Sequence, residues 1–486
     1  MIVLNASFIY ALPGLALVLF LLYKAVSIKH LRQPAPFPPG PEPLPVLGNI
    51  LDMPKTQPWK TFSQWGKEYG GIVHATALGT HYIIINDPQY AVELLDKKGK
   101  IYSDRPRLMM AGEIIGWGDS PPLCQLSETW SEYRRLLASF IGSRSKVEQF
   151  SDVLQRETNE LLKRMLDNPI NFVDHFRSFS GTIVLRLTYG YKAASENEPL
   201  VRLVVETLRQ FSETTISNAF LVDVLPILRF VPSFFPGAAW KRKAIRYREC
   251  LDETLRKPYE WTKQQMIHLN EREERILQWA AVGIYGGGTE TTVAALTSFI
   301  LGITRHTTEL QKAQSEIDAV IGKDRLPTLE DRSRLPYFEA LCLEIHRKYP
   351  FGPLGLPHVP REDDVHDGYY IPKDSVVIAN LWQFCQDEKL YPNPQVFSPE
   401  RFIGDMKQLD PMEILFGYGR RHLAEAALWL ACANIIAAFD IRPPIKDGKY
   451  MIPPGNFLDG SVTHPEPFEC VITPRSKLSA YLVQQA

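Results

Sequence analysis

Residues 270–303, NEREERILQWAAVGIYGGGTETTVAALTSFILGI, begin polar and then become apolar and rich in small side chains. The pattern predicts a single long helix. Gly286-Gly287-Gly288 lies inside it, although each glycine costs a helix interior roughly 1 kcal/mol relative to alanine. Two explanations remain open: a flat ligand pressed against the backbone, or a tight crossing with another helix. Glu290 and Thr291 follow directly, and they carry the carboxylate and hydroxyl that proton delivery to a bound ligand requires.

The rest of the chain is also mainly helical in pattern. Periodic apolar runs predict helices near 148–165, 200–211, 335–349 and 422–438. Short β-rich segments predict a strand pair at 71–79 and 81–86 and a buried strand at 376–380. Helices dominate and the sheets are small and set apart, so the predicted fold class is α+β, mainly α.

Composition limits the classes of function. The chain has 486 residues, 45% of them hydrophobic, which is enough for a large core. The formal net charge is −1 and no basic stripe is present, so nucleic acid is not an expected partner. No two cysteines have CxxC spacing, which predicts buried thiols in a reducing compartment; they are Cys124, Cys250, Cys342, Cys385, Cys432 and Cys470.

The first 45 residues differ from the rest. Residues 2–23 carry no charge and, at about 1.5 Å per residue, could span a bilayer as a helix. Lys24 and Lys29 follow at once, which places the remainder of the chain on the cytoplasmic side. A cleaved signal peptide is the alternative, but its basic residues would come first. We therefore expect a membrane anchor at 1–33, a proline-rich hinge at 34–45 and one domain at 46–486.

Two sets of polar residues could form specific hydrogen-bonded contacts. Glu344 and Arg347 lie on one helical face, and Arg401 in Pro399-Glu400-Arg401-Phe402 could join them in a buried network. An ordinary surface pair is the alternative. Trp130 and Arg134, four residues apart, could donate to an anionic group, and His358 could be a further donor, although each taken singly could be purely structural.

The order of these features is more specific than any one of them. The chain runs from anchor and hinge through WxxxR, GGxETT, ExxR and PERF to Phe416-Gly417-Tyr418-Gly419-Arg420-Arg421. This arrangement strongly resembles the cytochrome P-450 haem-thiolate monooxygenases, and most of all the microsomal enzymes of fungal secondary metabolism. The resemblance covers residues 37–475 and implies the cytochrome P-450 fold, preceded here by one transmembrane helix.

The resemblance also implies a function. Such an enzyme uses haem, dioxygen and electrons from an NADPH-dependent reductase to oxidise an apolar small molecule. A terpenoid or indolic metabolite is the substrate that the resemblance suggests. The protein would be a single-pass protein of the endoplasmic reticulum membrane with a cytoplasmic catalytic domain. We expect the apolar pocket to involve residues 106–124, 211–220, 353–357 and 461–462 together with Ile284.

Individual roles follow from the resemblance alone. Gly287 and Gly288 would let the long helix pass over the haem, while Glu290 and Thr291 would relay protons to the bound dioxygen. The structural network beneath the haem would consist of Glu344, Arg347 and Arg401. The haem propionates would be bound by Trp130, Arg134, His358 and Arg421, and the ligand loop would begin with Phe416 and Gly419.

The chain departs from the family where the ligand should stand. Arg421 is followed by His422-Leu423-Ala424-Glu425, whereas the family places a cysteine two residues after the arginine and a glycine two residues later. Read without a gap, Leu423 and Glu425 occupy those positions. A short deletion at 421–422 reconciles both sides. A second apparent gap, near 266–268, removes a helix and loop of the family pattern.

Two residues could replace the missing ligand. His422 is near the correct place, but an imidazole lacks the electron push that a thiolate gives to O–O cleavage. Cys432 lies ten residues further along a helix, on an apolar face that predicts core packing. Two functional hypotheses therefore stand: a P-450 monooxygenase, or a catalytically inactive homologue without a haem ligand, from a decayed gene or an incorrectly spliced product.

Overall fold

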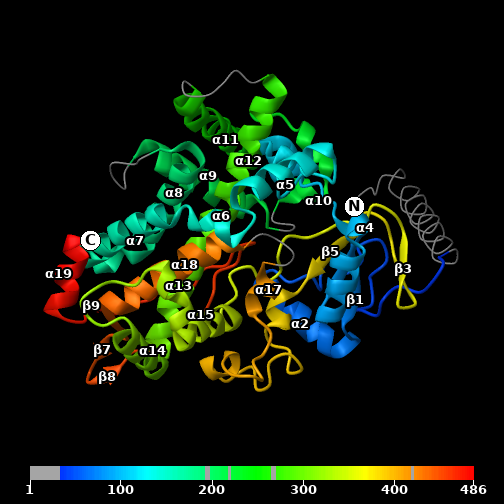
Figure 1. The fold of residues 1–486 in the computed structure, drawn as a ribbon. Coiled ribbons are helices and arrows are strands. Elements are labelled where there is room, and N and C mark those ends of the chain that lie inside the picture. Colours follow the sequence, from blue (N-terminus) through cyan, green and yellow to red (C-terminus); the bar gives the residue numbers. More distant parts are fainter. Residues whose placement is uncertain (1–32, 192–197, 217–219, 264–269, 417–420) are drawn as a thin grey trace, which may run out of the picture. The chain divides into compact units, whose positions relative to one another are not determined.

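The computed structural model describes residues 33–191, 198–216, 220–263, 270–416 and 421–486 (Figure 1). The chain forms two compact units. One runs up to Pro106 and includes Pro357–Ala379, and the other comprises Arg107–Leu356 and Asn380–Ala486. The expected anchor at 2–23 and the apparent gap at 266–268 lie outside the described residues. Within the described ranges, no helix combines the length and apolarity needed to cross a membrane.

The first unit contains the predicted strand pair. β1 (Ile72–Ala77) and β2 (Thr80–Ile85) are antiparallel, and β2 pairs in parallel with β5 (Val376–Ala379), in the order β1-β2-β5. Four consecutive residues of β2, 82–85, are buried. The other elements are α2 (Pro58–Tyr69), α3 (Pro88–Ala91), η1 (Val92–Lys97), α4 (Gly99–Tyr102), and the hairpin of β3 (Asp364–His366) and β4 (Tyr369–Ile371).

The second unit is mostly helical. Its first half contains η2 (Met109–Ile115), η3 (Trp117–Asp119), α5 (Glu128–Ile141), α6 (Arg144–Glu148), α7 (Ser151–Asp167), η4 (Pro169–Asn171), α8 (Phe172–Tyr189), α9 (Pro199–Thr214), α10 (Leu221–Val224), η5 (Pro226–Phe230) and α11 (Ala239–Lys263). Its second half contains α12 (Glu271–Gly288), α13 (Glu290–Arg305), α14 (Thr307–Val320), η6 (Leu329–Arg334), α15 (Pro336–Lys348), α16 (Leu381–Phe384), η7 (Pro399–Phe402), α17 (Pro411–Leu415), α18 (His422–Ala438) and α19 (Lys477–Gln485).

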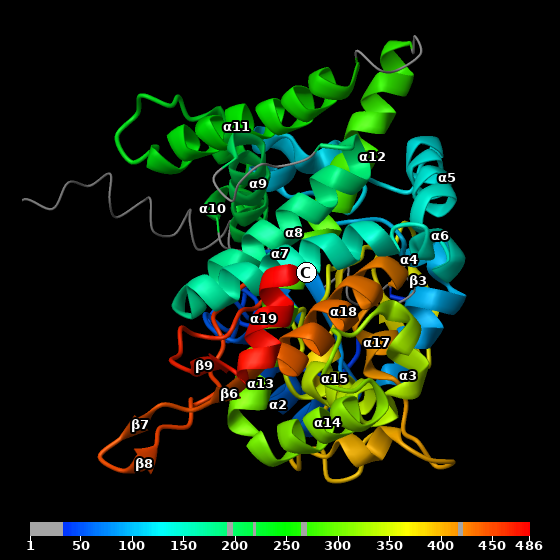
Figure 2. The same ribbon diagram turned by 60° about the vertical axis from the view of Figure 1, so that its left-hand side comes forward.

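Small sheets complete this unit. β6 (Phe439–Arg442) pairs with β9 (Val471–Pro474), and β7 (Ile445–Lys446) pairs with β8 (Lys449–Tyr450), both antiparallel. Figure 2 shows the β7–β8 hairpin projecting from the helices of its unit. The described part of the chain is thus mostly helical with small sheets, as the sequence predicts.

The prediction of one unbroken helix at 270–303 is wrong. α12 begins at a capping box formed by Asn270 and Glu273, and it ends at Gly288. Thr289, with φ −97° and ψ −74°, separates it from α13. Periodicity alone could not reveal this break, because the apolar pattern continues through it and only the glycines weaken the helix locally.

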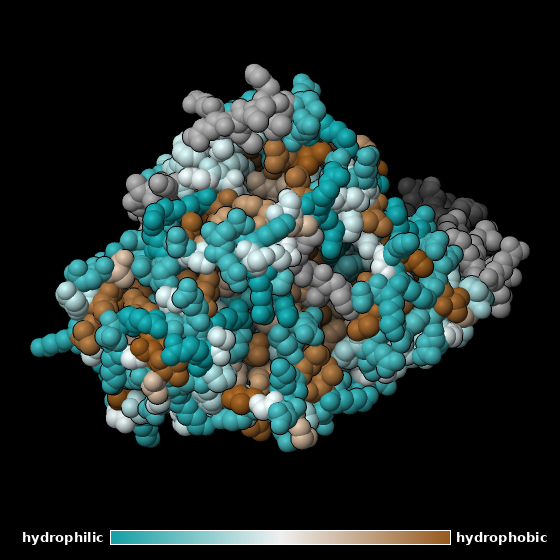
Figure 3. All heavy atoms as spheres, viewed as in Figure 1, coloured by the Kyte–Doolittle hydropathy of each residue, from teal (hydrophilic) through white to brown (hydrophobic). Residues whose placement is uncertain are grey.

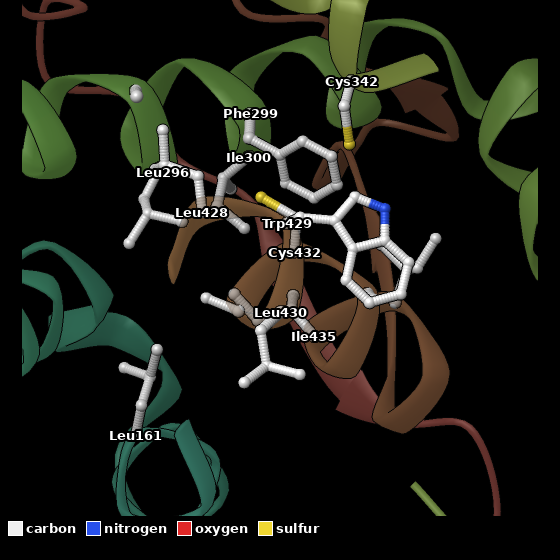
Figure 4. Close-up of a cluster of buried hydrophobic side chains, with 14 of the residues drawn as sticks. Leu161, Leu296, Phe299, Ile300, Cys342, Leu428, Trp429, Leu430, Cys432 and Ile435 are labelled. Carbon is white, nitrogen blue, oxygen red and sulfur yellow. The ribbon is translucent and has the colours of Figure 1, made fainter. Parts of the chain in front are cut away.

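The main core of the second unit surrounds α13 and α18. Figure 4 shows Leu296, Phe299 and Ile300 of α13 close to Leu428 and Trp429 of α18, in a cluster of fully or almost fully buried side chains. Polar residues cover most of the face drawn in Figure 3, and apolar residues form separate patches on it. The expected helix at 422–438 is confirmed at both ends, because α18 spans these residues.

A glycine permits the closest helix contact in this core. A Cβ built on Gly302 of α13 would lie 2.9 Å from Cγ1 of Ile345 on α15, closer than real Cβ contacts. Glycine is therefore required for the two helices to approach at this point. This contact brings α15, which carries Glu344 and Arg347, against the long helix pair.

We predict that buried histidine makes the protein acid-sensitive. His346 on α15 is buried, and burial lowers its pKa to about 4. Below pH 6.5 the unfolded chain therefore binds a proton at His346 that the folded chain does not bind. The free energy of unfolding has its full value above pH 6.5 and decreases as the pH falls toward 4. Between pH 6.5 and 5 the loss is roughly 2 kcal/mol for this ring. His346→Gln should reduce by that amount the difference in unfolding free energy between pH 7 and pH 5, measured by urea denaturation.

The control is Ile345→Val, which disturbs the neighbouring core position and keeps the imidazole. It should lower stability at both pH values and leave their difference as in the parent protein. A His346→Gln variant with an unchanged difference would contradict the assignment of this acid sensitivity to His346.

Candidate functional site

The break between α12 and α13 is held by hydroxyl groups. Ser180 of α8 donates to the carbonyl oxygens of Gly288 and Thr289, at 2.8 and 3.1 Å. Thr291 donates to the carbonyl oxygen of Gly287. These bonds bind backbone carbonyls at the break, so its shape depends on particular side chains.

The three glycines serve different purposes. A Cβ on Gly286 or Gly287 would meet nothing within 4 Å, so this face of α12 is open to an approaching group. A Cβ on Gly288 would lie 3.2 Å from Val184 of α8, so this glycine serves helix packing. The helix-packing explanation therefore applies at Gly288, whereas a flat ligand against Gly286 and Gly287 stays a prediction.

Glu290, the first residue of α13, is buried and ion-paired. Its Oε2 lies 3.0 Å from Nε2 of His464 in the loop before β9. The helix N-terminus favours a carboxylate at this position. Thr289, beside it, has a fully buried hydroxyl without a hydrogen-bond partner. The two expected catalytic residues, Glu290 and Thr291, thus lie at the break; Glu290 contacts a distant loop, and Thr291 bonds the preceding turn.

Trp130 and Arg134 lie on one side of α5. The Arg134 guanidinium is 4.9 Å from the centre of the Trp130 ring, a cation–π contact. The helix is amphipathic, yet Tyr133 is its only fully buried residue among those described. Trp130 is half-buried and Arg134 is exposed, and their role at an anionic ligand stays a prediction.

His358 lies in the first unit and is hydrogen-bonded there. Its Nδ1–H donates to the carbonyl oxygen of Tyr102 at 2.7 Å. Burial, together with the nearby charge of Arg105, lowers the pKa of His358 to about 3. The ring is therefore neutral in this structure, with its Nδ1–H bound to Tyr102. The role of His358 at a haem propionate stays a prediction.

Glu344, Arg347 and Arg401 come together in the second unit. The Arg347 guanidinium binds both carboxylate oxygens of Glu344, at 2.7 and 2.8 Å, and both side chains are 0% exposed. Arg401 Nε lies 3.1 Å from Glu344 Oε2. The surface-pair alternative is thereby excluded.

The same three side chains hold the chain that follows α16. Arg347 donates to the carbonyl oxygens of Cys385 and Pro394, and the Ser398 N–H donates to Glu344. Arg401 donates to the carbonyl oxygen of Val396 at 2.9 Å. Every charge in this network is met by an opposite charge or a backbone dipole.

The junction before α18 contains no sulfur ligand. Phe416 stacks edge-on against Phe351, and Gly419 lies outside the described residues. Arg421 Nε lies 2.8 Å from Glu425, and its Nη1 lies 3.2 Å from Asp410. Its positive charge is therefore balanced within the chain. His422, which begins α18, has a buried Nδ1 without a partner.

Cys432 is not available as a substitute ligand. It is 2% exposed and packs inside the main core, near Cys342 of α15 (Figure 4). Burial, with a hydrogen bond to Cys432, raises the pKa of the Cys342 thiol well above its usual value. Both groups are therefore core thiols. No disulfide forms among the six cysteines, all of which lie in described ranges.

Two residues of this region were missed by the reasoning from sequence. Ser180 carried only a weak signal, as a small polar residue in the apolar helix 172–189. His464 stood out as a histidine between Thr463 and Pro465 in a loop without periodicity. Neither signal identifies a partner more than 100 positions away.

Comparison with known proteins shows the family. The cytochrome P-450 family model matches residues 38–472. The chain is 42% identical to cytochrome P-450 monooxygenase 208 of Postia placenta, over 96% of this chain and 95% of that protein. It is 40% identical to monooxygenase claR of Ampulloclitocybe clavipes, over 92% and 88%, and 33% identical to monooxygenase ppsD of Aspergillus oryzae, over 98% and 95%. The chain belongs to the cytochrome P-450 family.

Membership of this family implies a haem cofactor, a reductase as electron donor and a small-molecule substrate. The open face at Gly286 and Gly287 fits a flat group lying against α12. The donor set does not fit, because no cysteine lies between Cys385 and Cys432 in the whole sequence. Nor do the described residues contain a cluster of three or more metal-binding side chains. The residues present therefore do not supply the axial thiolate.

We predict that the buried network is essential for folding. Glu344→Ala removes the one carboxylate between two buried guanidinium groups and should cost roughly 3–5 kcal/mol of unfolding free energy. Glu260→Ala, which breaks the exposed Arg256–Glu260 pair of α11, should change stability by no more than about 0.5 kcal/mol. Urea denaturation measures both. A Glu344→Ala protein as stable as the Glu260→Ala protein would show that the network contributes little.

Proposed function

We propose that this chain is built as a membrane-anchored P-450 monooxygenase for an apolar small molecule, using dioxygen and electrons from an NADPH-dependent reductase. The observation that carries the proposal is the broken helix pair α12–α13, with an open glycine face and a carboxylate and hydroxyl beside it. The haem of this family supplies the oxidising chemistry. The residues of the chain would bind the substrate, exclude water and hold protons near the break.

The nature of the substrate is inferred from the packing of three segments. Phe211 of α9 lies 4.6 Å from Trp117 of η3, measured between ring centres. Thr215 Oγ1 lies 3.1 Å from Ser461 Oγ. Phe211 and Thr215 thus link η3 to Ser461, and the contact between Phe211 and Trp117 is apolar. This supports an apolar substrate; a terpenoid or another secondary metabolite rests on resemblance to fungal enzymes.

A second candidate function is that of a catalytically inactive homologue. The observation that favours it is the sequence Arg421-His422, where the family ligand is missing. The pairing of Arg421 with Glu425 and Asp410 leaves its charge satisfied without a haem propionate. A protein of this kind would keep the fold and could bind a small molecule at a membrane without oxidising it.

We predict that the ligand segment alone separates these two functions. The chain as it stands should give no thiolate-type Soret band when it is reduced and exposed to carbon monoxide. Insertion of a short Cys-Pro-Gly-containing segment between Arg421 and His422 should restore the red-shifted band, because the remaining scaffold is intact.

The matched control is the same insertion with serine in place of cysteine, which should give no such band. A restored segment without the band would contradict the monooxygenase proposal. A thiolate-type band from the chain as it stands would contradict the inactive homologue and point to another cysteine, which Cys432→Ala would test. Sequencing the transcript across Arg421 and His422 would show whether the segment is missing from the natural protein.

We also propose that residues 1–33 anchor the protein in the endoplasmic reticulum membrane, that 34–45 form the hinge, and that 46–486 face the cytoplasm. The full chain should float with membranes in a density gradient and resist extraction at alkaline pH, because residues 2–23 are uncharged and long enough to span a bilayer. A chain that begins at residue 34 should be released. Quantitative release of the full chain by alkaline extraction would contradict a spanning anchor.

A further inference from the structure

The loop 456–466 brings a histidine to the break between α12 and α13. His464 Nε2 lies 3.0 Å from Glu290 Oε2. The side chain of His464 is 21% exposed and that of Glu290 is 10% exposed. The histidine therefore stands between the solvent and a nearly buried carboxylate.

The backbone around His464 is fixed independently of Glu290. The Thr463 N–H donates to the carbonyl oxygen of Phe351 at 2.8 Å, and the Thr463 hydroxyl donates to that of Pro350. The carbonyl oxygen of His464 itself accepts from the Leu458 N–H at 2.9 Å. The backbone that carries the imidazole is therefore fixed without a contribution from Glu290.

Glu290 lies directly after the break between α12 and α13. At this break the hydroxyl groups of Ser180 and Thr291 donate to the carbonyl oxygens of residues 287–289. Without a partner, a glutamate side chain at this point would sample several rotamers. The imidazole 3.0 Å away restricts the carboxylate to the rotamers that keep this contact.

We propose that His464 is the positioning residue for Glu290: it holds the carboxylate at the helix break in one orientation. The proposal deepens the proposed function, since it assigns a fixed geometry to the carboxylate expected to move protons there. The contact itself involves only residues of this chain. It can therefore be tested separately from the presence of haem.

The first test is nuclear magnetic resonance of the full chain with 15N-labelled histidine. An imidazole N–H directed at the Glu290 carboxylate should give a downfield proton signal that exchanges slowly with water. His464→Gln should remove this signal and so assign it. Glu290→Gln should remove or strongly shift it, whereas Glu466→Gln, in the same loop, should leave it in place.

The second test measures access to the ring. Diethyl pyrocarbonate modifies imidazole nitrogen, so His464 should react faster in Glu290→Gln than in the parent protein, followed by peptide mass spectrometry. His464→Phe should expose the Glu290 carboxylate to carbodiimide coupling. His464→Gln, which keeps an N–H donor near the position of Nε2, should restore part of the protection. If His464→Phe does not fold, Glu290→Gln alone decides the result.

The outcomes separate the two proposals. Loss of the imidazole signal in Glu290→Gln supports the positioning role, whatever the carbon monoxide spectrum shows. A signal that is absent from the parent protein, or unchanged in Glu290→Gln with unchanged reactivity of His464, would overturn it. Failure of the monooxygenase proposal appears only in the spectrum of the chain with the restored cysteine.

Discussion

The second unit depends on keeping three charges out of water. Glu344 and Arg347 are completely buried, and such charges are tolerated only when each is paired and hydrogen-bonded. Arg401 and the carbonyl oxygens of Cys385 and Pro394 complete the pairing. Because these partners come from α15 and from the segment that follows α16, the network joins regions that periodic hydrophobic packing alone would not hold in register.

Polar side chains within an apolar region also shape the break between α12 and α13. α13 is buried almost throughout, so it could have continued α12 without interruption. The glycines lower the local helix stability, and hydroxyl groups from Ser180 and Thr291 offer alternative partners for carbonyls. The break leaves an open face next to Glu290. An open glycine face therefore lies beside a break in an otherwise regular helix.

At the junction Arg421–His422 the fold is kept although the residue expected to bind the haem iron is missing. α18 begins where the family pattern requires and packs into the main core, although no cysteine precedes it. Its buried side chains lie mainly within residues 426–438, and Phe416 before the junction packs against the same core. Arg421 finds Glu425 and Asp410 as partners. The fold therefore tolerates the loss of a residue on which the oxidation depends.

The sequence by itself determined the family, the mainly helical class and the helices and strands with strong periodicity, such as α15, α18 and the β1–β2 pair. These follow from local propensity and from motifs in a fixed order, both of which can be read directly from the sequence. It also showed that the ligand cysteine is missing. Only the tertiary structure decided that α12 and α13 are separate, that His358 is neutral and bound to Tyr102, and that His464 meets Glu290. These features depend on burial and on partners distant in sequence, which no local pattern records.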